Sequence, residues 1–299
     1  SIIRPRTNIN YVLALIFELV FSAGIILLGD FFNTRVRATY DIEAITNIPL
    51  ISNIVHSKKE AKDIDLNTFS HSLTAESIRT LRTQLQMLNG SGNQTILVTS
   101  STSNEGKTFT SIKLAKGYSN LNKKTILVGY DLRKPILSEL LNHSNEIGIS
   151  SFLAGEYEAE EIIQKTTNNY LDIITEGPLS PNPTELIASR RTKELFNYLR
   201  SYYDHIIIDS PPIGVVPDSK LIMNETDINL LIVRQSKTRK IELINTLKNL
   251  NKNQVKNLYL VLNDFSPKTH QYSYMYKYYA DKQSQKAKKP KKRLFQRLF

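Results

Sequence analysis

Cysteine is missing from this chain of 299 residues, so no disulfide bond stabilises it, an absence that suits a reducing compartment. Acidic side chains are in the minority: 28 aspartates and glutamates stand against 39 lysines and arginines, and the net charge is +11 at pH 7. The five histidines lack the spacing of metal ligands, and the sequence has no internal repeat. With 40% hydrophobic residues the chain can still bury a substantial core, and we predict one large domain with extensions.

Long apolar runs are scarce, with one exception near the N-terminus. The longest apolar run is residues 11–28 (YVLALIFELVFSAGIILL). A helix of this length nearly spans a hydrocarbon layer of about 30 Å. A buried core helix and a signal peptide are the alternatives, although the residues after the run make a poor cleavage site. Glu18 is costly in lipid and is expected to face a partner helix or to lie protonated near the interface. We predict an outer juxtamembrane segment (1–10), a transmembrane helix (11–29) and a cytoplasmic linker (30–68).

A phosphate-binding motif occupies the segment Ile96–Thr108 (ILVTSSTSNEGKT). We predict a strand, a loop of small residues and a helix from near Gly106, so that loop amides and the positive helix end form one anion site. There Lys107 bridges β- and γ-phosphates, and the Thr108 hydroxyl binds Mg²⁺. Ser101 stands where the standard pattern has glycine, and an ordinary capped helix start is the alternative. The predicted ATP-binding residues of this segment are Ser103, Asn104, Glu105, Gly106, Lys107, Thr108 and Phe109.

Apolar strands alternate with helical stretches after this loop. The alternation predicts an α/β fold of the P-loop NTPase type, with a doubly wound, mostly parallel sheet in a domain over residues 69–266. Two strands lead into acidic residues, Asp131 and Asp209. Because ligands of such sheets bind at the carboxyl ends of strands, we expect both carboxylates beside the P-loop as Mg²⁺ ligands and, with Lys107, as catalytic residues. Aspartates that cap the next turn are the alternative.

An amphipathic helix is predicted over residues 72–88, ahead of the P-loop. Glu76, Arg79 and Arg82 follow one another at intervals of three and share roughly one stripe of that helix. As a bare pattern, the stripe favours a solvated, salt-bridged face over a subunit interface.

The composition changes sharply in residues 267–299, where a cluster of tyrosines precedes a run of lysines. We predict an exposed, disordered tail. The basic run is expected to contact anionic lipid rather than nucleic acid, because a membrane span is predicted in the same chain. Simple solvation of a charged tail is the alternative.

Together these motifs resemble the bacterial tyrosine kinases (BY-kinases) attached to polysaccharide co-polymerases, proteins of capsule and exopolysaccharide biosynthesis. TSSTSNEGKT resembles the P-loop of that family, ILVGYDLRKP its second acidic motif and HIIIDSPP its third. Glu76, Arg79 and Arg82 match its ExxRxxR motif, which implies subunit contacts in a ring and replaces the solvated-face interpretation. Asn263 matches a residue implied in adenine binding. The resemblance implies autophosphorylation of the tail at Tyr272, Tyr274, Tyr276, Tyr278 and Tyr279.

The resemblance implies a membrane-anchored, ATP- and Mg²⁺-dependent protein-tyrosine autokinase of the bacterial inner membrane, with a cytoplasmic kinase domain. The implied partners are further copies of the chain in a ring, the membrane, the polysaccharide export machinery and a tyrosine phosphatase, but no nucleic acid. In the family an outer-facing domain and a first span precede the matched part. Since the chain starts with Ser1, we expect it to be a fragment of a longer protein.

The second acidic motif departs from the family pattern of two aspartates spaced two residues apart. Gly129 takes the first position, and Asp131 alone remains. The resemblance implies that the missing aspartate organises the Mg²⁺ site or accepts the tyrosine proton. Gly129 therefore favours an alternative function, a weak kinase or pseudokinase that binds ATP and scaffolds a polysaccharide export complex. An ATPase that does not phosphorylate tyrosine is a third hypothesis.

Overall fold

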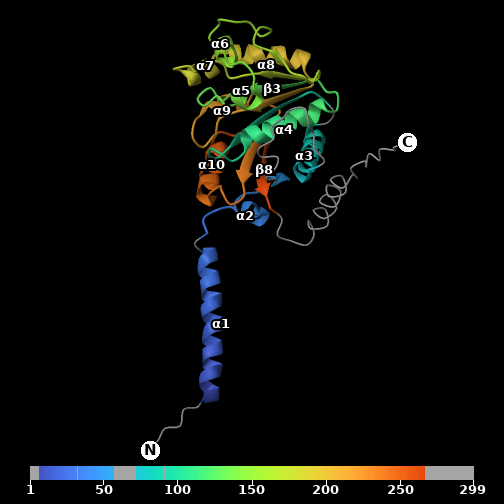
Figure 1. The fold of residues 1–299 in the computed structure, drawn as a ribbon. Helices are drawn as coiled ribbons and strands as arrows, with labels where there is room; N and C mark the ends of the chain where they lie inside the picture. The colour runs from blue at the N-terminus through green and yellow to red at the C-terminus, as the bar shows by residue number, and fades with distance from the viewer. Residues whose placement is uncertain (1–6, 32, 57–71, 90–91, 267–299) are drawn as a thin grey trace, which may run out of the picture. The chain divides into compact units, whose positions relative to one another are not determined.

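The computed structural model describes residues 7–31, 33–56, 72–89 and 92–266. The chain divides into two compact units, Ser1–Arg35 and Val36–Phe299, and the first contains the helix α1 (Thr7–Phe31) (Figure 1). Across the part of the chain that the structure describes, no helix meets the length and apolar character that a membrane crossing needs, so the span predicted over residues 11–29 is not supported. The predicted tyrosine cluster and basic tail lie outside the described residues.

The second unit is built on an eight-stranded sheet in the order β1-β8-β7-β2-β6-β3-β5-β4. All neighbouring strands run parallel except β4 and β5. Apolar runs form the central strands because both of their faces are buried. This confirms the predicted P-loop NTPase-type α/β fold. The strands are β1 (Leu50–Val55), β2 (Gln94–Ser100), β3 (Thr125–Gly129), β4 (Gln164–Lys165), β5 (Leu171–Ile174), β6 (His205–Asp209), β7 (Ile228–Arg234) and β8 (Leu258–Phe265).

Helices cover both faces of the sheet. One apolar core lies under α3, α4 and α5, and a second lies under α2 and α6 to α10 on the other face (Figure 1). These helices are α2 (Thr39–Glu43), α3 (Leu73–Asn89), α4 (Lys107–Ser119), α5 (Leu137–Leu141), α6 (Ile149–Leu153), α7 (Pro183–Ala188), α8 (Arg190–Tyr202), α9 (Asp218–Met223) and α10 (Lys240–Lys252).

The edge strand β1 lies in the segment that the sequence assigns to a linker. It pairs with β8, and Val55 is tied to α3: its N–H donates to Ser77 Oγ (3.2 Å) and its carbonyl accepts from Thr74 Oγ1 (2.9 Å). The compact unit begins at Val36, whereas the sequence predicts the domain boundary near Phe69. The difference arises because the partner strand of β1 is at the far end of the domain sequence, so no local pattern reveals the pairing.

Candidate active site

A cavity of about 270 Å³ opens where the central strands end and α4 begins. The loop between β2 and α4 forms one wall, and the segments after β3 and β6 form the others. The lining residues are Ser103, Asn104, Gly106, Lys107, Thr108, Phe109, Asp131, Arg133, Lys134, Ile136, Pro211, Pro212, Val215 and Val216. The structure thus brings Asp131 together with every predicted P-loop residue except Glu105.

The P-loop is shaped by left-handed backbone at Asn104 and Gly106, with φ values of 64° and 94°. A Cβ added at Gly106 would lie 2.0 Å from Asn263 Nδ2, so the close approach requires glycine. Asn263, in β8, donates from Nδ2 to the Glu105 carbonyl at 2.9 Å. This asparagine, for which the resemblance implies adenine binding, does not line the cavity, and the contact that it makes holds the loop.

Glu105 does not line the cavity and is fully buried. Its carboxylate accepts from the Thr102 N–H (3.0 Å), the Thr102 hydroxyl (3.1 Å) and the Thr238 hydroxyl. Burial raises the pKa of Glu105, and these hydrogen bonds act against the rise. Ser101 does not adopt a positive φ, so the glycine of the standard motif is not needed there to avoid backbone strain.

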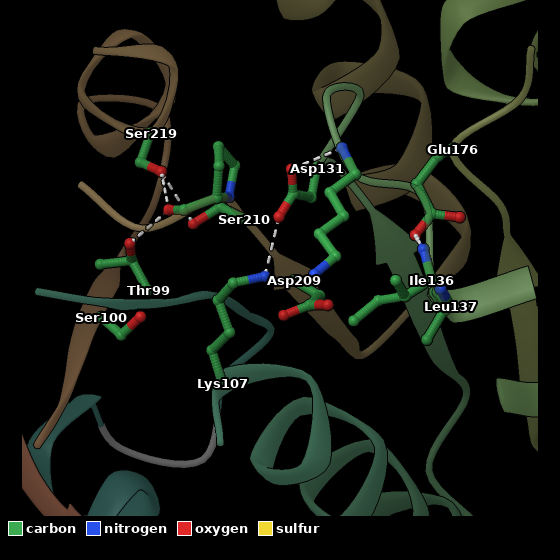
Figure 2. A network of polar contacts seen from close by, with 12 residues as sticks. Thr99, Ser100, Lys107, Asp131, Ile136, Leu137, Glu176, Asp209, Ser210 and Ser219 are labelled. Carbon is green, nitrogen blue, oxygen red and sulfur yellow. Dashed lines mark hydrogen bonds and ion pairs between the residues drawn. The ribbon is translucent and has the colours of Figure 1, made fainter. Parts of the chain in front are cut away.

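Lys107, the first residue of α4, forms a buried ion pair with Asp131. Lys107 Nζ donates to Asp131 Oδ2 at 2.9 Å, and the two side chains are 9% and 6% exposed (Figure 2). Burial alone would lower the pKa of Lys107, but the carboxylates of Asp209, Asp131 and Glu176 raise it above its ordinary value. The surrounding carboxylates therefore favour the charged form of Lys107 where the sequence predicts phosphate binding.

Asp209 ends β6 and is fully buried. Its Oδ1 accepts from Ser111 Oγ at 3.3 Å, the Thr108 side chain hydrogen-bonds to the same carboxylate, and Oδ2 has no partner among the described residues. Burial raises the pKa of Asp209, whereas the Lys107 charge lowers it. An unpartnered carboxylate oxygen beside a hydroxyl fits Mg²⁺, which prefers oxygen ligands and binds through one or two carboxylates plus substrate phosphates. The described residues contain no cluster of three acidic, histidine or cysteine side chains that would hold a metal alone.

Hydroxyl groups fix the segment that follows Asp209. Thr99 Oγ1 donates to the Pro211 carbonyl at 2.7 Å (Figure 2). Ser210 Oγ donates to the Val98 carbonyl at 3.0 Å. Ser219 Oγ reaches Ser210 Oγ (3.1 Å) and the Pro211 carbonyl (2.6 Å). These bonds hold the Pro211 wall of the cavity against β2.

Sequence reasoning missed three charged residues of this region, Arg133, Lys134 and Glu176. Arg133 lines the cavity and donates from Nε to Asp218 Oδ2 at 2.7 Å. Glu176 is buried just after the end of β5, and its side chain occupies the space beside Gly129. The available signal for Glu176 was the one that identified Asp209, an acidic residue at the end of an apolar strand.

The predicted oligomerisation residues lie on α3, as expected, but differ in their surroundings. Arg79 Nη1 donates to Glu76 Oε2 at 2.6 Å, and both side chains are about one-third exposed, at 31% and 33%. Arg82 Nη1 donates to the Gly117 carbonyl of α4 at 2.6 Å, and burial lowers the pKa of its guanidinium. Arg82 therefore joins α3 to α4 within one chain, while the pair of Glu76 and Arg79 is partly exposed.

Comparisons with known proteins agree with this geometry. A family model described as an AAA domain matches residues 93–263. The tyrosine-protein kinase YwqD of Bacillus subtilis is 34% identical over 170 residues, 56% of this chain and 72% of the relative. The tyrosine-protein kinase etk of Escherichia coli is 28% identical over 253 residues, which are 78% of this chain but 35% of the relative.

The chain thus spans most of one relative and about a third of the other. Among solved structures, the kinase domain of Escherichia coli tyrosine kinase ETK matches with a TM-score of 0.71 and 27% identity, over 78% of this chain and 96% of that domain. With the P-loop, Asp131 and Asp209 placed as described, the chain belongs to the bacterial tyrosine-protein kinases with an AAA domain.

Proposed function

We propose that this protein is an ATP-dependent protein-tyrosine kinase that phosphorylates its own tyrosines and regulates the polymerisation and export of capsular or exopolysaccharide. The observation that carries the proposal is one cavity lined by a phosphate-binding loop, Lys107 and Asp131, with the buried carboxylate of Asp209 close enough to act on the Lys107 ammonium. The kinase names of the relatives support it. The kinase domain would act in the cytoplasm, with the polysaccharide export machinery and a tyrosine phosphatase as partners.

Phosphoryl transfer depends mainly on positioning and charge neutralisation. Loop amides and Lys107 would hold the β- and γ-phosphates, and Thr108, Asp131 and Asp209 would hold Mg²⁺, which neutralises further phosphate charge. To contact the phosphates of ATP, Lys107 would have to give up its ion pair with Asp131, because the two side chains neutralise each other's charge in this structure. The tyrosine oxygen bonds to the γ-phosphorus, the bond between that phosphorus and ADP breaks, and the tyrosine proton passes to a carboxylate of the site.

Replacement of the five tail tyrosines by phenylalanine tests this proposal. Incubation with labelled ATP and Mg²⁺ is expected to give phosphotyrosine in the natural protein, mapped to Tyr272, Tyr274, Tyr276, Tyr278 and Tyr279. The variant with all five tyrosines replaced should lose most of the label, because the hydroxyl groups that accept the phosphoryl group are gone. Tyr202→Phe, which removes an exposed hydroxyl on α8, is the control and should keep the label. No phosphotyrosine in the natural protein would contradict the proposal.

Assembly into a ring is part of the proposal, and the surroundings of α3 make its test specific. Arg79→Ala removes a partly exposed arginine of the stripe and is expected to leave the domain monomeric by light scattering, because a subunit contact made by this charge would be lost. Arg190→Ala, which removes an exposed arginine of α8, should leave the mass unchanged. Arg82→Ala should instead lower the melting temperature, since it breaks the bond to Gly117. An unchanged mass for Arg79→Ala would return the stripe to a solvated face.

A pseudokinase that binds ATP and scaffolds an export complex is the second candidate, favoured by Gly129. It predicts tight nucleotide binding and no phosphotyrosine in the natural protein or in any variant. The phosphotyrosine map described above separates the two candidates.

A further inference from the structure

Gly129 and Glu176 come from paired strands and compete for one space. Gly129 is the last residue of β3, and Glu176 follows β5, whose Ile174 pairs with Val128. A Cβ added at Gly129 would lie 2.9 Å from the Glu176 carboxyl carbon and 3.1 Å from its Cγ. Carbon atoms pack best at about 3.5–4.0 Å, so this contact is too close. The carboxyl group of Glu176, together with Leu137 Cδ2 at 3.1 Å from the same point, fills the space that a side chain at residue 129 would enter.

Both oxygens of that carboxyl group are informative. Glu176 is 1% exposed, and its Oε1 accepts from the backbone N–H groups of Leu137 (2.9 Å) and Ile136 (3.1 Å) (Figure 2). Ile136 lines the cavity, so this bond fixes the wall that follows Asp131. Oε2 is buried and has no partner among the described residues. Glu176 thus holds the wall of the site with one oxygen and keeps a second acceptor unused.

The carboxylate also belongs to the charge system of the cavity. Although burial opposes the charged form of Lys107, Asp209, Asp131 and Glu176 together raise the pKa of its ammonium. Burial raises the pKa of Glu176, and the Asp209 charge adds to that rise. Lys107 thus pairs directly with Asp131, and the charges of Asp209 and Glu176 also favour its charged form. These carboxylates come from three strand ends, those of β3, β5 and β6.

We propose that Glu176 supplies, from β5, the carboxylate that the end of β3 lacks, and that it is a positioning residue for phosphoryl transfer. Its oxygen holds the backbone after Asp131, and its charge acts on Lys107. This inference rests on the proposed kinase function. Under this proposal Gly129 is no longer a sign of a weak kinase, because the glycine leaves space for a carboxylate from the neighbouring strand.

A set of matched variants tests the proposal. Glu176→Gln keeps the size of the side chain and one oxygen acceptor for Ile136 and Leu137 but removes the charge. Gly129→Asp places a carboxylate on β3 while Glu176 still fills the space. Glu176→Ala combined with Gly129→Asp moves the carboxylate from one strand to the other, and Glu176→Ala with Gly129→Asn is its uncharged control. Each is measured for thermal unfolding, phosphotyrosine formation and ADP release from Mg²⁺-ATP.

Thermal unfolding, which needs no substrate, tests whether the side chains of residues 129 and 176 compete for one space. Gly129→Asp alone is expected to lower the melting temperature, because it must displace the buried Glu176 side chain. In the Glu176→Ala background the same substitution should cost less or stabilise. Equal effects of Gly129→Asp in both backgrounds would overturn the proposed competition.

Activity reports the role of the charge. Glu176→Gln is expected to lower the rate by about tenfold or more, because Lys107 loses one of the charges that act on its ammonium. A small displacement of a group that holds the phosphates has effects of up to about 100-fold. The Glu176→Ala/Gly129→Asp double variant should recover to within about threefold of the natural rate, a loss below 1 kcal/mol. Its asparagine counterpart should stay low. A natural rate in Glu176→Gln, or equal rates in the two double variants, would overturn the inference.

ADP release separates this inference from the kinase proposal. If the natural protein releases ADP but forms no phosphotyrosine, the kinase function fails, and the same pattern of variants in ADP release still supports the role of Glu176. If phosphotyrosine forms normally in Glu176→Gln, the kinase function stands and the role of Glu176 fails.

Discussion

Lys107→Met is expected to abolish phosphotyrosine formation, with a loss of about 100-fold or more, because it removes the fixed positive charge on which phosphate positioning depends. The methionine fills similar volume but leaves Asp131 and Asp209 buried without their shared cation. Breaking a buried pair by removing one partner costs about 3–5 kcal/mol, so the variant should also unfold at a lower temperature.

The pH dependence of that stability loss has a definite sign. Without the Lys107 charge, which lowers the pKa of Asp209, the folded-state pKa of this carboxyl rises further. A group whose folded pKa exceeds its unfolded value destabilises the fold once the pH rises through that interval. The melting temperature of Lys107→Met should therefore approach that of the natural protein as the pH falls from 7 toward about 5.

Lys123→Met is the matched control, because it removes an exposed charge before β3, at the opposite end of the strands. It should keep the natural rate and melting temperature. An unimpaired rate in Lys107→Met would exclude this lysine from phosphate binding.

Asp209→Asn is expected to lower the Mg²⁺-dependent rate by about 100-fold or more, because amide oxygen replaces the carboxylate beside Thr108 in a buried site. The ligand-free variant should be at least as stable as the natural protein. Burial raises the pKa of Asp209, which means that the fold disfavours its charge, and Lys107 retains Asp131 as a partner after the substitution. Activity and stability should thus change in opposite directions.

A second buried aspartate provides the contrast. Asp172, near the start of β5, accepts from Lys165 Nζ (2.7 Å) and the Tyr203 hydroxyl (2.7 Å). Asp172→Asn should lower the melting temperature and leave the rate per folded molecule near the natural value. If Asp209→Asn instead destabilises the protein as Asp172→Asn does, then Asp209 is a structural residue and its assignment as a metal ligand is wrong.

The amino-acid sequence by itself determined the parts of the site that depend on local order. Short apolar runs followed by turn residues specify buried parallel strands, and the carboxyl ends of such strands meet at one edge of the sheet. Lys107, Asp131 and Asp209 each sit at or soon after a strand end, so their approach followed from the alternation of strands and helices. The departure at Gly129 was equally visible, since it is a change of residue type within a motif.

Only the tertiary structure decided the contacts between distant segments. The pairing of β1 with β8, the bond from Asn263 to the P-loop and the bond from Arg82 to Gly117 depend on which elements are neighbours in space. The same holds for Glu176, which enters the space beside Gly129 because β5 lies next to β3. Local patterns set which residues are buried, but the packing of the whole sheet decides side-chain direction and strand partners. In the sequence Gly129 looks like the loss of a carboxylate, whereas in the fold it leaves space for the carboxylate of Glu176.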